Sequence, residues 1–183
     1  MKWRRVTLAV LLLLAGGAWV YWWQAVWLER SQDGPIRAAA QRYGLQPALV
    51  KAVVWRESRF HPLARGRAQE LGLMQLRETA AQEWADAEGI APFRHDHCLD
   101  PCTNTLAGAW YLRKLLRRYT RTDDPLPYAL ADYNAGRGNV IKWNYGRGAT
   151  NSTAFIDQIG FPATKDYVKA VVRRYNGYRV TFR

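Results

Sequence analysis

An uncharged segment of 23 residues, Val6 to Leu28, is the feature that most constrains how this chain folds. At ~1.5 Å per residue, a helix of this length spans roughly 34 Å, which is enough to cross the hydrocarbon core of a bilayer. Aromatic residues gather towards its far end, as they do at membrane–water interfaces: Trp19, Tyr21, Trp22, Trp23 and Trp27. The segment therefore predicts a membrane anchor.

Basic residues before this segment predict its orientation. Lys2, Arg4 and Arg5 should stay in the cytoplasm under the positive-inside rule, so that the rest of the chain faces outward. We expect residues 1–28 to form this basic tip and a transmembrane anchor, residues 29–34 a polar linker, and residues 35–183 one domain. The alternative is a cleaved signal peptide, for which Gly16-Gly17-Ala18 is a weak cleavage site, although the apolar run continues well beyond it.

Helical signals dominate the remaining residues. Pro47 stands where a helix-starting proline belongs, and Thr164 looks like the N-cap of a last helix. Periodicity and helix breakers predict helices over the ranges 35–43, 47–59, 73–87, 104–119, 128–134 and 164–175, with no convincing strand alternation. The sequence therefore predicts an all-α domain of about 150 residues, which is large enough to bury a core.

The net charge narrows the class of partner. The chain carries a formal charge of +12, of which +9 remains when the three N-terminal basic residues are set aside. A basic protein favours polyanions such as nucleic acid, anionic lipid or an acidic cell-wall polymer. The outward topology argues against nucleic acid, and most of the Lys and Arg residues are expected simply to solvate helix faces.

Cys98 and Cys102 are the only cysteines in the chain. Outside the cytoplasm they would either form a small local disulfide or remain as two idle thiols. A metal site that includes the neighbouring His95 and His97 is a weaker alternative. We expect neither a metal nor another cofactor.

Glu57 is the strongest candidate for an acid or base. On the helix that begins at Pro47, Leu49 and Val53 are spaced four residues apart, and Glu57 continues their row. The carboxyl group therefore projects from the inward-facing stripe, where loss of solvation should raise its pKa. A raised pKa lets a carboxylic acid hold a proton near neutral pH and donate it to a leaving group. The alternative is a structural glutamate paired with a basic residue.

Two further segments carry polar groups suited to a ligand. Gly72-Leu73-Met74-Gln75-Leu76 combines a glycine, which permits close backbone approach, with an amide that can bind sugar hydroxyls or an acetamide. Tyr133 and Asn134 end a short apolar helix just before Gly136, so that a phenol and an amide lie beside a turn. On its own, the first segment is better explained as an ordinary buried helix start. An Asn-Gly helix end explains the second and is compatible with a binding role.

Together these segments resemble the family 1 lytic transglycosylases, of the soluble lytic transglycosylase type, which have a goose-lysozyme-like catalytic domain. The similarity covers about residues 35–178 and follows five motifs in order. They are Glu57-Ser58-x-Phe60-x-Pro62, then Gly72 to Leu76 at a spacing of fifteen positions, N-x-x-x-G-x-x-Y-L over 104–112, Ala131 to Gly136, and Phe161 to Val168. Two departures are Gly66, where many relatives carry Ser, and Arg77-Glu78, where many carry Met-Pro.

The resemblance implies a reaction and roles for individual residues. Glu57 would protonate the glycosidic oxygen between N-acetylmuramic acid (MurNAc) and N-acetylglucosamine (GlcNAc) in peptidoglycan. It would then take a proton from the muramoyl C6 hydroxyl as a 1,6-anhydro ring closes. Substrate-binding or orienting roles would fall to Gln75, Tyr133, Ser58, Asn134, Met74 and Tyr167. Glu70 and Asp132 are the nearest second carboxylates, and each is expected to be structural.

The expected protein is thus a single-pass enzyme of the bacterial inner membrane with its catalytic domain in the periplasm. Its partners would be peptidoglycan glycan strands and, through the anchor, the membrane, whereas any partner in the envelope or division machinery is unknown. One alternative is a hydrolytic muramidase on the same fold, which would leave reducing sugar ends. A second is a non-catalytic glycan-binding wall protein, and a third is a DNA-associated role, which the predicted topology opposes.

Overall fold

The computed structural model describes the backbone of residues 2–182, and the side chains within this range except those at positions 2, 4, 5, 8 and 9. The predicted basic residues Lys2, Arg4 and Arg5 therefore have no described side chains, and Met1 and Arg183 lie outside the described residues. The described chain is all-α, as predicted, with isolated β-bridges but no sheet. Its segments are α1 (Lys2–Ser31), α2 (Asp33–Arg42), α3 (Pro47–Ser58), α4 (Glu78–Glu88), η1 (His95–Leu99), α5 (Pro101–Arg118), α6 (Pro125–Ala135), α7 (Arg137–Trp143), η2 (Gly146–Ala149), α8 (Ser152–Gln158) and α9 (Pro162–Thr181).

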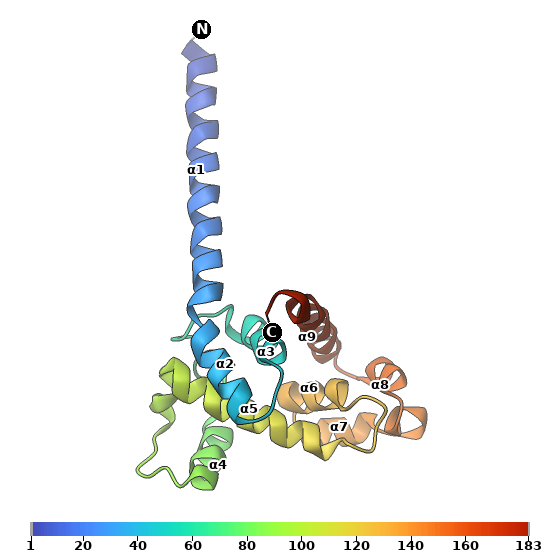
Figure 1. Ribbon diagram of the computed structural model, residues 1–183. Coiled ribbons are helices and arrows are strands. Elements are labelled where there is room, and N and C mark those ends of the chain that lie inside the picture. The colour runs from blue at the N-terminus through green and yellow to red at the C-terminus, as the bar shows by residue number, and fades with distance from the viewer. Residues whose placement is uncertain (1, 183) are drawn as a thin grey trace.

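Helix α1 stands out from the rest of the molecule as a long isolated rod (Figure 1). Its apolar side chains face outward along most of its length, and that of Leu13 is 77% exposed. The rings of Trp19, Trp22 and Trp23 contact one another with centroids 5.8–6.1 Å apart. Within the described residues, one helix is long and apolar enough to cross a membrane.

The predicted polar linker over residues 29–34 is helical apart from Gln32. Two of its polar side chains, those of Glu29 and Asp33, form hydrogen bonds and ion pairs with the domain. Tyr178 donates a hydrogen bond to Glu29 Oε1 over 2.8 Å, and Arg174 Nη2 lies 3.6 Å from Glu29 Oε2. Asp33 accepts a 2.6 Å hydrogen bond from the buried Lys51 ammonium group. These contacts attach the end of α1 and the start of α2 to α9 and α3.

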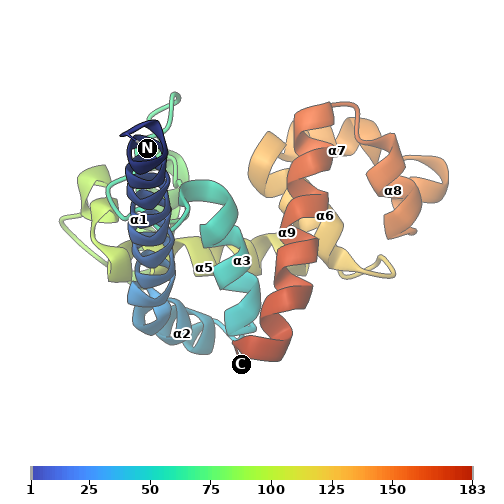
Figure 2. The same cartoon turned by 90° about the horizontal axis from the view of Figure 1, so that it is seen from above.

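Helix α5 forms the centre of the domain. It packs against α2, α4 and η1 and, on another face, against α6. Helix α9 closes the second half by packing on α3 and α6, and the view along α1 shows α3 and α9 running beside each other (Figure 2). Large side chains that are fully buried fill the interior of this arrangement: Tyr128, Tyr167, Phe155, Ile36, Leu73, Met74, Leu76, Leu112, Leu115 and Leu130.

Most of the predicted helices are present, but several boundaries differ. The helix predicted over 73–87 begins only at Glu78, because residues 71–76 form a tight turn with a bridge between Leu71 and Leu76. Helices α7 and α8 were not predicted, and α6 extends over Pro125–Ala135 rather than 128–134. The last helix begins at Pro162, so Thr164 lies inside it and is not its N-cap.

Candidate active site

Glu57 lies in the last turn of α3, where local sequence fixes its position. Pro47 begins this helix, and its side chains from Ala48 to Val54 are buried. The helix ends because Arg59 and Phe60 adopt left-handed backbone conformations, with φ of 53° and 66°. Glu57 thus stands at the negative end of a helix, a place that disfavours an ionised carboxylate.

Several neighbours set the protonation of Glu57. The pKa of Glu57 is raised from 4.5 to about 7; burial is the largest influence, and the charge of Glu70 acts in the same direction. A hydrogen bond from Tyr167 Oη to Glu57 Oε1, 2.5 Å long, and the charge of Arg56 act in the opposite direction. The balance leaves Glu57 substantially protonated near neutral pH, as the sequence predicted.

The turn over residues 71–76 is held by one buried side chain, Asn104. Its Nδ2 donates to the carbonyl oxygens of Leu71 and Cys98, each over 2.8 Å, and its Oδ1 accepts from the Met74 N–H over 2.7 Å. Gly72 passes so close that an added Cβ would lie 2.3 Å from Asn104 Nδ2, and its φ is +75°. Only glycine fits this approach without displacement.

Gln75 ends this turn with a φ of 46° and turns its amide back on the chain. Its Nε2 donates to the carbonyl oxygens of Gly72 (2.8 Å) and Ala64 (3.1 Å). Both amide hydrogens are therefore satisfied within the protein. What Gln75 can offer a ligand is chiefly its side-chain oxygen, an acceptor for a hydroxyl or N–H group.

Helix α6 supplies the opposite wall. Tyr133 donates a 2.7 Å hydrogen bond to the Met74 carbonyl oxygen, which ties α6 to the turn below Glu57. Burial raises the pKa of Tyr133 well above 10, so this phenol stays neutral. Asn134 accepts a 2.8 Å hydrogen bond at Oδ1 from Thr164, so its side-chain N–H groups remain for a ligand.

These elements enclose a cavity of about 460 Å³, a size typical of small-molecule sites. Its walls come from the end of α3, the turn before α4, the middle of α5 and the end of α6. The lining residues are Glu57, Glu70, Gln75, Leu76, Arg77, Thr79, Ala80, Tyr111, Asp132, Tyr133, Asn134, Ala135 and Gly136. The cavity thus brings three carboxyl groups, amides, phenols and a guanidinium group together.

The structure brings together most, but not all, of the residues singled out from the sequence. Glu57, Gln75, Tyr133 and Asn134 line the cavity, and Tyr167 contacts Glu57 from behind. Three predicted binding residues do not belong to this lining: Ser58, Met74 and Tyr167. The Ser58 hydroxyl donates a 3.2 Å hydrogen bond to the carbonyl oxygen of Val54 in its own helix. As the residue after Glu57, Ser58 points to a different face of that helix.

Met74 is a core residue, so its predicted binding role is corrected together with that of Ser58. Its side chain is fully buried, and its Sδ would lie 2.3 Å from a Cβ added to Gly108. Only its backbone contributes to the site: the Met74 N–H donates a hydrogen bond to Asn104, and the Met74 carbonyl oxygen accepts one from Tyr133. An apolar side chain inside a motif is thus a packing contact in this chain.

Sequence reasoning missed Tyr111, Arg77, Thr79 and Ala80 as lining residues. Tyr111 and Asn104 both lie in the segment N-x-x-x-G-x-x-Y-L over 104–112, so the signal for them was present. The ring of Tyr111 packs on that of Tyr133 with centroids 5.6 Å apart. Arg77 lies directly after the Gly72 to Leu76 motif, where the chain departs from many relatives.

The two other carboxylates of the cavity already have partners. Burial alone would raise the pKa of Glu70, but N–H donors, including that of Ala68 at 2.9 Å, and Arg77 hold it below its usual range. Asp132 accepts hydrogen bonds at Oδ2 from Arg118 (2.5 Å) and Tyr119 (2.7 Å). Both side chains are therefore engaged within the protein, which fits their predicted structural roles.

The position of the Glu70 side chain explains why residue 66 is a glycine. A Cβ added to Gly66 would lie 2.2 Å from Glu70 Oε2 and 2.9 Å from Gln75 Oε1. The carboxylate of Glu70 and the amide of Gln75 thus occupy the space that a side chain at position 66 would need. The glycine found at position 66, where many relatives carry Ser, thus leaves room for the side chain of Glu70.

The cysteines lie outside this cavity. Both are unpaired, Cys98 being buried and Cys102 exposed, and burial raises the pKa of the Cys98 thiol to about 12. Among residues 2–182, no three His, Cys, Asp or Glu side chains gather as ligands for a metal ion. His95 is engaged with the carbonyl oxygen of Leu76, 2.9 Å from its Nε2.

Comparisons with known proteins place this geometry in context. Residues 34–156 match the family described as the transglycosylase SLT domain. The membrane-bound lytic murein transglycosylase F of Desulfosudis oleivorans is 36% identical over 108 residues, which are 57% of this chain and 22% of that protein. The chain therefore spans about a quarter, or less, of the length of the relatives described here.

Solved structures share the same fold. An inactive Glu-to-Gln mutant of the lytic transglycosylase Slt from Pseudomonas aeruginosa gives a TM-score of 0.73 at 27% identity, over 81% of this chain and 24% of that one. The 70 kDa soluble lytic transglycosylase of Escherichia coli gives 0.69 at 27% identity, over 79% and 24%. A complex of a 70-kDa soluble lytic transglycosylase with bulgecin A gives 0.72 at 26% identity, over 81% and 24%.

Proposed function

Because the chain belongs to the transglycosylase SLT domain family, we propose that it is a membrane-anchored lytic transglycosylase that cleaves the β-1,4 bond between MurNAc and GlcNAc in peptidoglycan. The observation that carries this proposal is the Glu57 carboxyl group, whose pKa of about 7 keeps a proton available in a cavity lined by amides and phenols. A buried carboxylic acid of this kind suits general acid catalysis at a glycosidic oxygen.

The first step is proton donation. Tyr167 occupies Glu57 Oε1, so Oε2 is the oxygen left to carry the proton into the cavity. Transfer of this proton to the glycosidic oxygen releases GlcNAc as the leaving alcohol while the bond to the MurNAc C1 breaks. The acetamide of the substrate supports the positive charge that develops at C1, so a second protein carboxylate is not required.

The second step regenerates the acid. The Glu57 carboxylate removes a proton from the C6 hydroxyl of MurNAc, and the C6 oxygen forms a bond to C1. The product is a 1,6-anhydro ring, and Glu57 recovers its proton without consuming water. One residue thus acts as acid and then as base, as microscopic reversibility permits.

The engagement of the other carboxylates supports this single-acid mechanism over hydrolysis. Enzymes with two catalytic carboxylates need the second to act as a nucleophile or as a base towards water. Glu70 and Asp132 are instead fully committed to N–H donors, guanidinium groups and a phenol. A hydrolytic muramidase on the same fold remains the second candidate, and the product ends distinguish it.

Four residues are proposed to bind the sugars. Gln75 offers an acceptor oxygen, Asn134 offers N–H donors, and the ring of Tyr111 offers an apolar face beside Tyr133. Such groups match the hydroxyls, acetamides and apolar ring faces of amino sugars. Tyr167 is a positioning residue, because it acts on the substrate only through Glu57.

The anchor determines where this activity would occur. We propose that α1 crosses the bacterial inner membrane and that the domain, residues 35–183, lies in the periplasm. The exposed apolar side chains of α1 and its aromatic cluster support this placement. Tethering would restrict cleavage to peptidoglycan near the membrane, and no partner in the envelope machinery is specified by these residues.

The test is to incubate the full-length protein, purified in a non-ionic detergent, with purified peptidoglycan and to weigh the products by mass spectrometry. A transglycosylase yields anhydromuramic ends that are one water lighter than the reducing ends left by a muramidase. Glu57→Gln should abolish cleavage and retain binding to the same peptidoglycan. Reducing ends would favour the muramidase, whereas unchanged cleavage by the Glu57→Gln protein would reject Glu57 as the acid.

A further inference from the structure

A second cavity lies away from Glu57, between α2, α4 and α5. It has a volume of about 430 Å³, close to that of the catalytic cavity, and it is lined by Tyr43, Glu88, Trp110, Arg113, Lys114 and Arg117. Four of these residues come from α5 at spacings of three and four, so they form one continuous face of that helix. Three of the four are cationic, and the fourth is a tryptophan.

Within the described part of the chain, the two guanidinium groups of this face have no partner. Neither Arg113 nor Arg117 makes an ion pair or side-chain hydrogen bond there, and the buried Nε of Arg113 lacks any acceptor. A buried donor without an acceptor is unfavourable, because it has lost its hydrogen bonds to water. The exposed Arg117 guanidinium and the partly buried Arg113 guanidinium therefore remain available to an acceptor that enters the cavity.

The acidic neighbours of the cavity are already engaged elsewhere. Glu88 forms an ion pair with Arg42 and accepts a 3.2 Å hydrogen bond from Tyr43. Glu83, on α4, pairs with Lys114. No carboxylate in the lining is thus left to neutralise Arg113 and Arg117. The cavity is suited to a ligand that brings its own negative charge, and paired guanidinium groups match a carboxylate particularly well.

Trp110 adds an apolar surface to this charged site. The Lys114 ammonium lies 5.6 Å from the Trp110 ring centroid and 5.9 Å from that of Tyr111. Tyr111 lines the catalytic cavity, so Lys114 stands at the boundary between the two sites. An aromatic ring beside cationic groups suits a ligand that has both an apolar face and an acidic group.

The position of the cavity separates it from the membrane. Tyr43 directly follows α2 and Glu88 ends α4, and the C-terminal ends of these two helices lie on the side of the domain opposite to the rising α1 (Figure 1). A lipid headgroup at the membrane surface would not reach this side. A polymer that passes the catalytic cavity and continues along α5 would reach it.

We propose that this second cavity is an accessory subsite for a carboxylate-bearing sugar of the same peptidoglycan strand, with Arg113 and Arg117 binding the carboxylate and Trp110 the sugar face. This inference rests on the proposed function, since it takes its ligand from the strand that is cleaved. The carboxylate belongs either to the peptide stem or, where the stem is absent, to the lactyl group of MurNAc.

The test compares long strands with a short soluble fragment that fills only the catalytic cavity, using the full-length protein in detergent. Arg113→Gln with Arg117→Gln should raise KM for long, stem-bearing strands by roughly fivefold to tenfold with kcat unchanged. Kinetics on the short fragment should not change. Lys142→Gln with Arg147→Gln is the matched control, because it removes two exposed charges that line neither cavity.

The source of the carboxylate follows from the treatment of the strands. Amidation of all carboxylates of the strands with a carbodiimide and an amine should erase the difference in KM between the variant and the parent. If amidase removal of the stems also erases this difference in KM, the subsite binds the stem carboxylate alone; if the difference persists, the lactyl carboxylate that the amidase exposes binds in its place. Equal KM values for the variant and its control on untreated strands would overturn the subsite.

Failure of the proposed function would give a different result from failure of the subsite. In that case the parent protein would cleave neither the long strands nor the short fragment. Cosedimentation of the parent, the variant and the control with untreated strands then measures the subsite without turnover. Loss of cosedimentation by the Arg113→Gln/Arg117→Gln protein alone supports the subsite, and equal cosedimentation of all three rejects it.

Discussion

At the scale of single residues, Glu57 and its proton would decide the pH dependence of the proposed cleavage. The acid must be protonated when a strand binds, and burial raises its pKa to about 7. We therefore expect cleavage to decline as pH rises through about 7 and to be largely lost by about pH 9. The measurement is kcat/KM on peptidoglycan strands from pH 5 to 9. A decline centred near 4.5, the ordinary value for a glutamate, would contradict the raised pKa.

The same pKa has a consequence for stability. The unfolded chain loses the Glu57 proton near pH 4.5, whereas the folded protein keeps it to about pH 7, so folding is progressively disfavoured as pH rises across that interval. Glu57→Gln removes the ionisation but keeps the size of the side chain. We expect this variant to have a higher Tm than the parent at pH 8 and a similar Tm at pH 4.5. Thermal unfolding followed by circular dichroism tests this without any substrate.

Tyr167 influences the pKa of Glu57 through a hydrogen bond. Its 2.5 Å hydrogen bond to Glu57 Oε1 lowers the pKa of the carboxyl, so Tyr167→Phe should move the alkaline limb of the pH profile to higher pH. Loss of the bond should also lower kcat by roughly fivefold to thirtyfold, since such bonds contribute about 1–2 kcal/mol. Tyr175→Phe, which removes an exposed bond to Gln46, is the control. A lower kcat with an unmoved limb would mean that Tyr167 only supports packing.

At the scale of elements, the turn before α4 depends on Asn104. Its fully buried amide satisfies the Leu71 and Cys98 carbonyls and the Met74 N–H. Asn104→Ala leaves all three groups unpaired, and we expect a loss of about 2–4 kcal/mol in the free energy of unfolding. Urea denaturation measures it. Asn139→Ala, which removes a single part-buried bond to Ala135, should cost much less, and equal losses would contradict the role of Asn104.

The elements that the sequence predicted well are those with strong local signals. Helices α3 and α5 carry a proline at their start and long apolar faces, and both were predicted to within a few residues. Residues 73–76 of the turn were mistaken for the start of a helix because Leu73, Met74 and Leu76 are apolar. The periodicity of such a short apolar run cannot separate a turn from a helix.

Tertiary contacts explain the other differences at this scale. Helices α7 and α8 have seven residues each, which is too short for a periodic pattern to be recognised. Thr164 looked like an N-cap, but its hydroxyl is used by Asn134, thirty residues earlier. The position of Glu57 on the inner face followed from its spacing alone. Its contact with Tyr167, 110 residues away, depends on how α9 packs on α3 and is invisible to local patterns.

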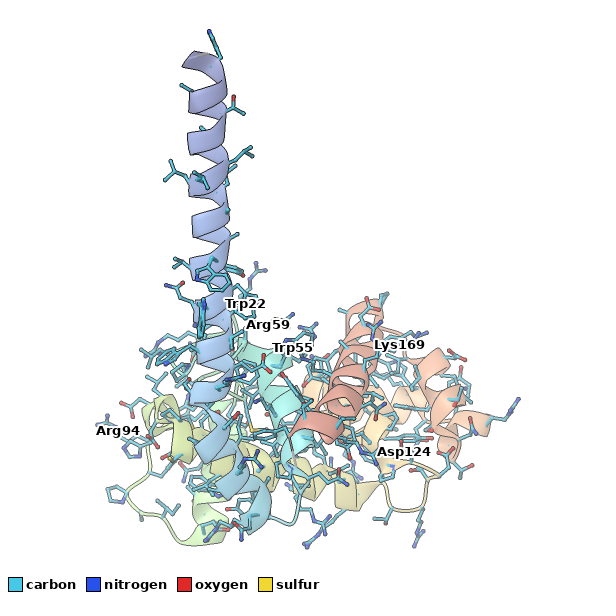
Figure 3. The ribbon with its side chains drawn as sticks, turned by 45° about the horizontal axis from the view of Figure 1, so that its top comes forward. Trp22, Trp55, Arg59, Arg94, Asp124 and Lys169 are labelled. Atoms are coloured by element: carbon cyan, nitrogen blue, oxygen red, sulfur yellow. The ribbon has the colours of Figure 1, made fainter. Side chains whose placement is uncertain are left out.

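At the scale of the whole molecule, the anchor and the domain behave as connected parts. The end of α1 is bonded to α9 through Glu29, and α2 is bonded to α3 through Asp33 and Lys51. Aromatic and basic side chains, including Trp22, Trp55 and Arg59, appear near the base of α1 (Figure 3). Arg59 stacks on Trp55 at 3.7 Å, and Arg174 approaches the same ring at 4.9 Å. A domain attached in this way has less freedom to swing than one on a flexible linker.

Membrane insertion of α1 leads to the last prediction. If the exposed leucines of α1 face lipid, the full-length protein should stay in the membrane pellet after a carbonate wash. Leu12→Arg with Leu13→Arg places two charges on this helix, each unfavourable by roughly 2.5–3.5 kcal/mol near a bilayer centre, and should release the protein while leaving its cleavage of soluble strands intact. Leu63→Arg, at an exposed leucine of the domain, should remain in the pellet. Release of the unaltered protein by carbonate would show that α1 is not a spanning helix, and cleavage would then not be confined to peptidoglycan near the membrane.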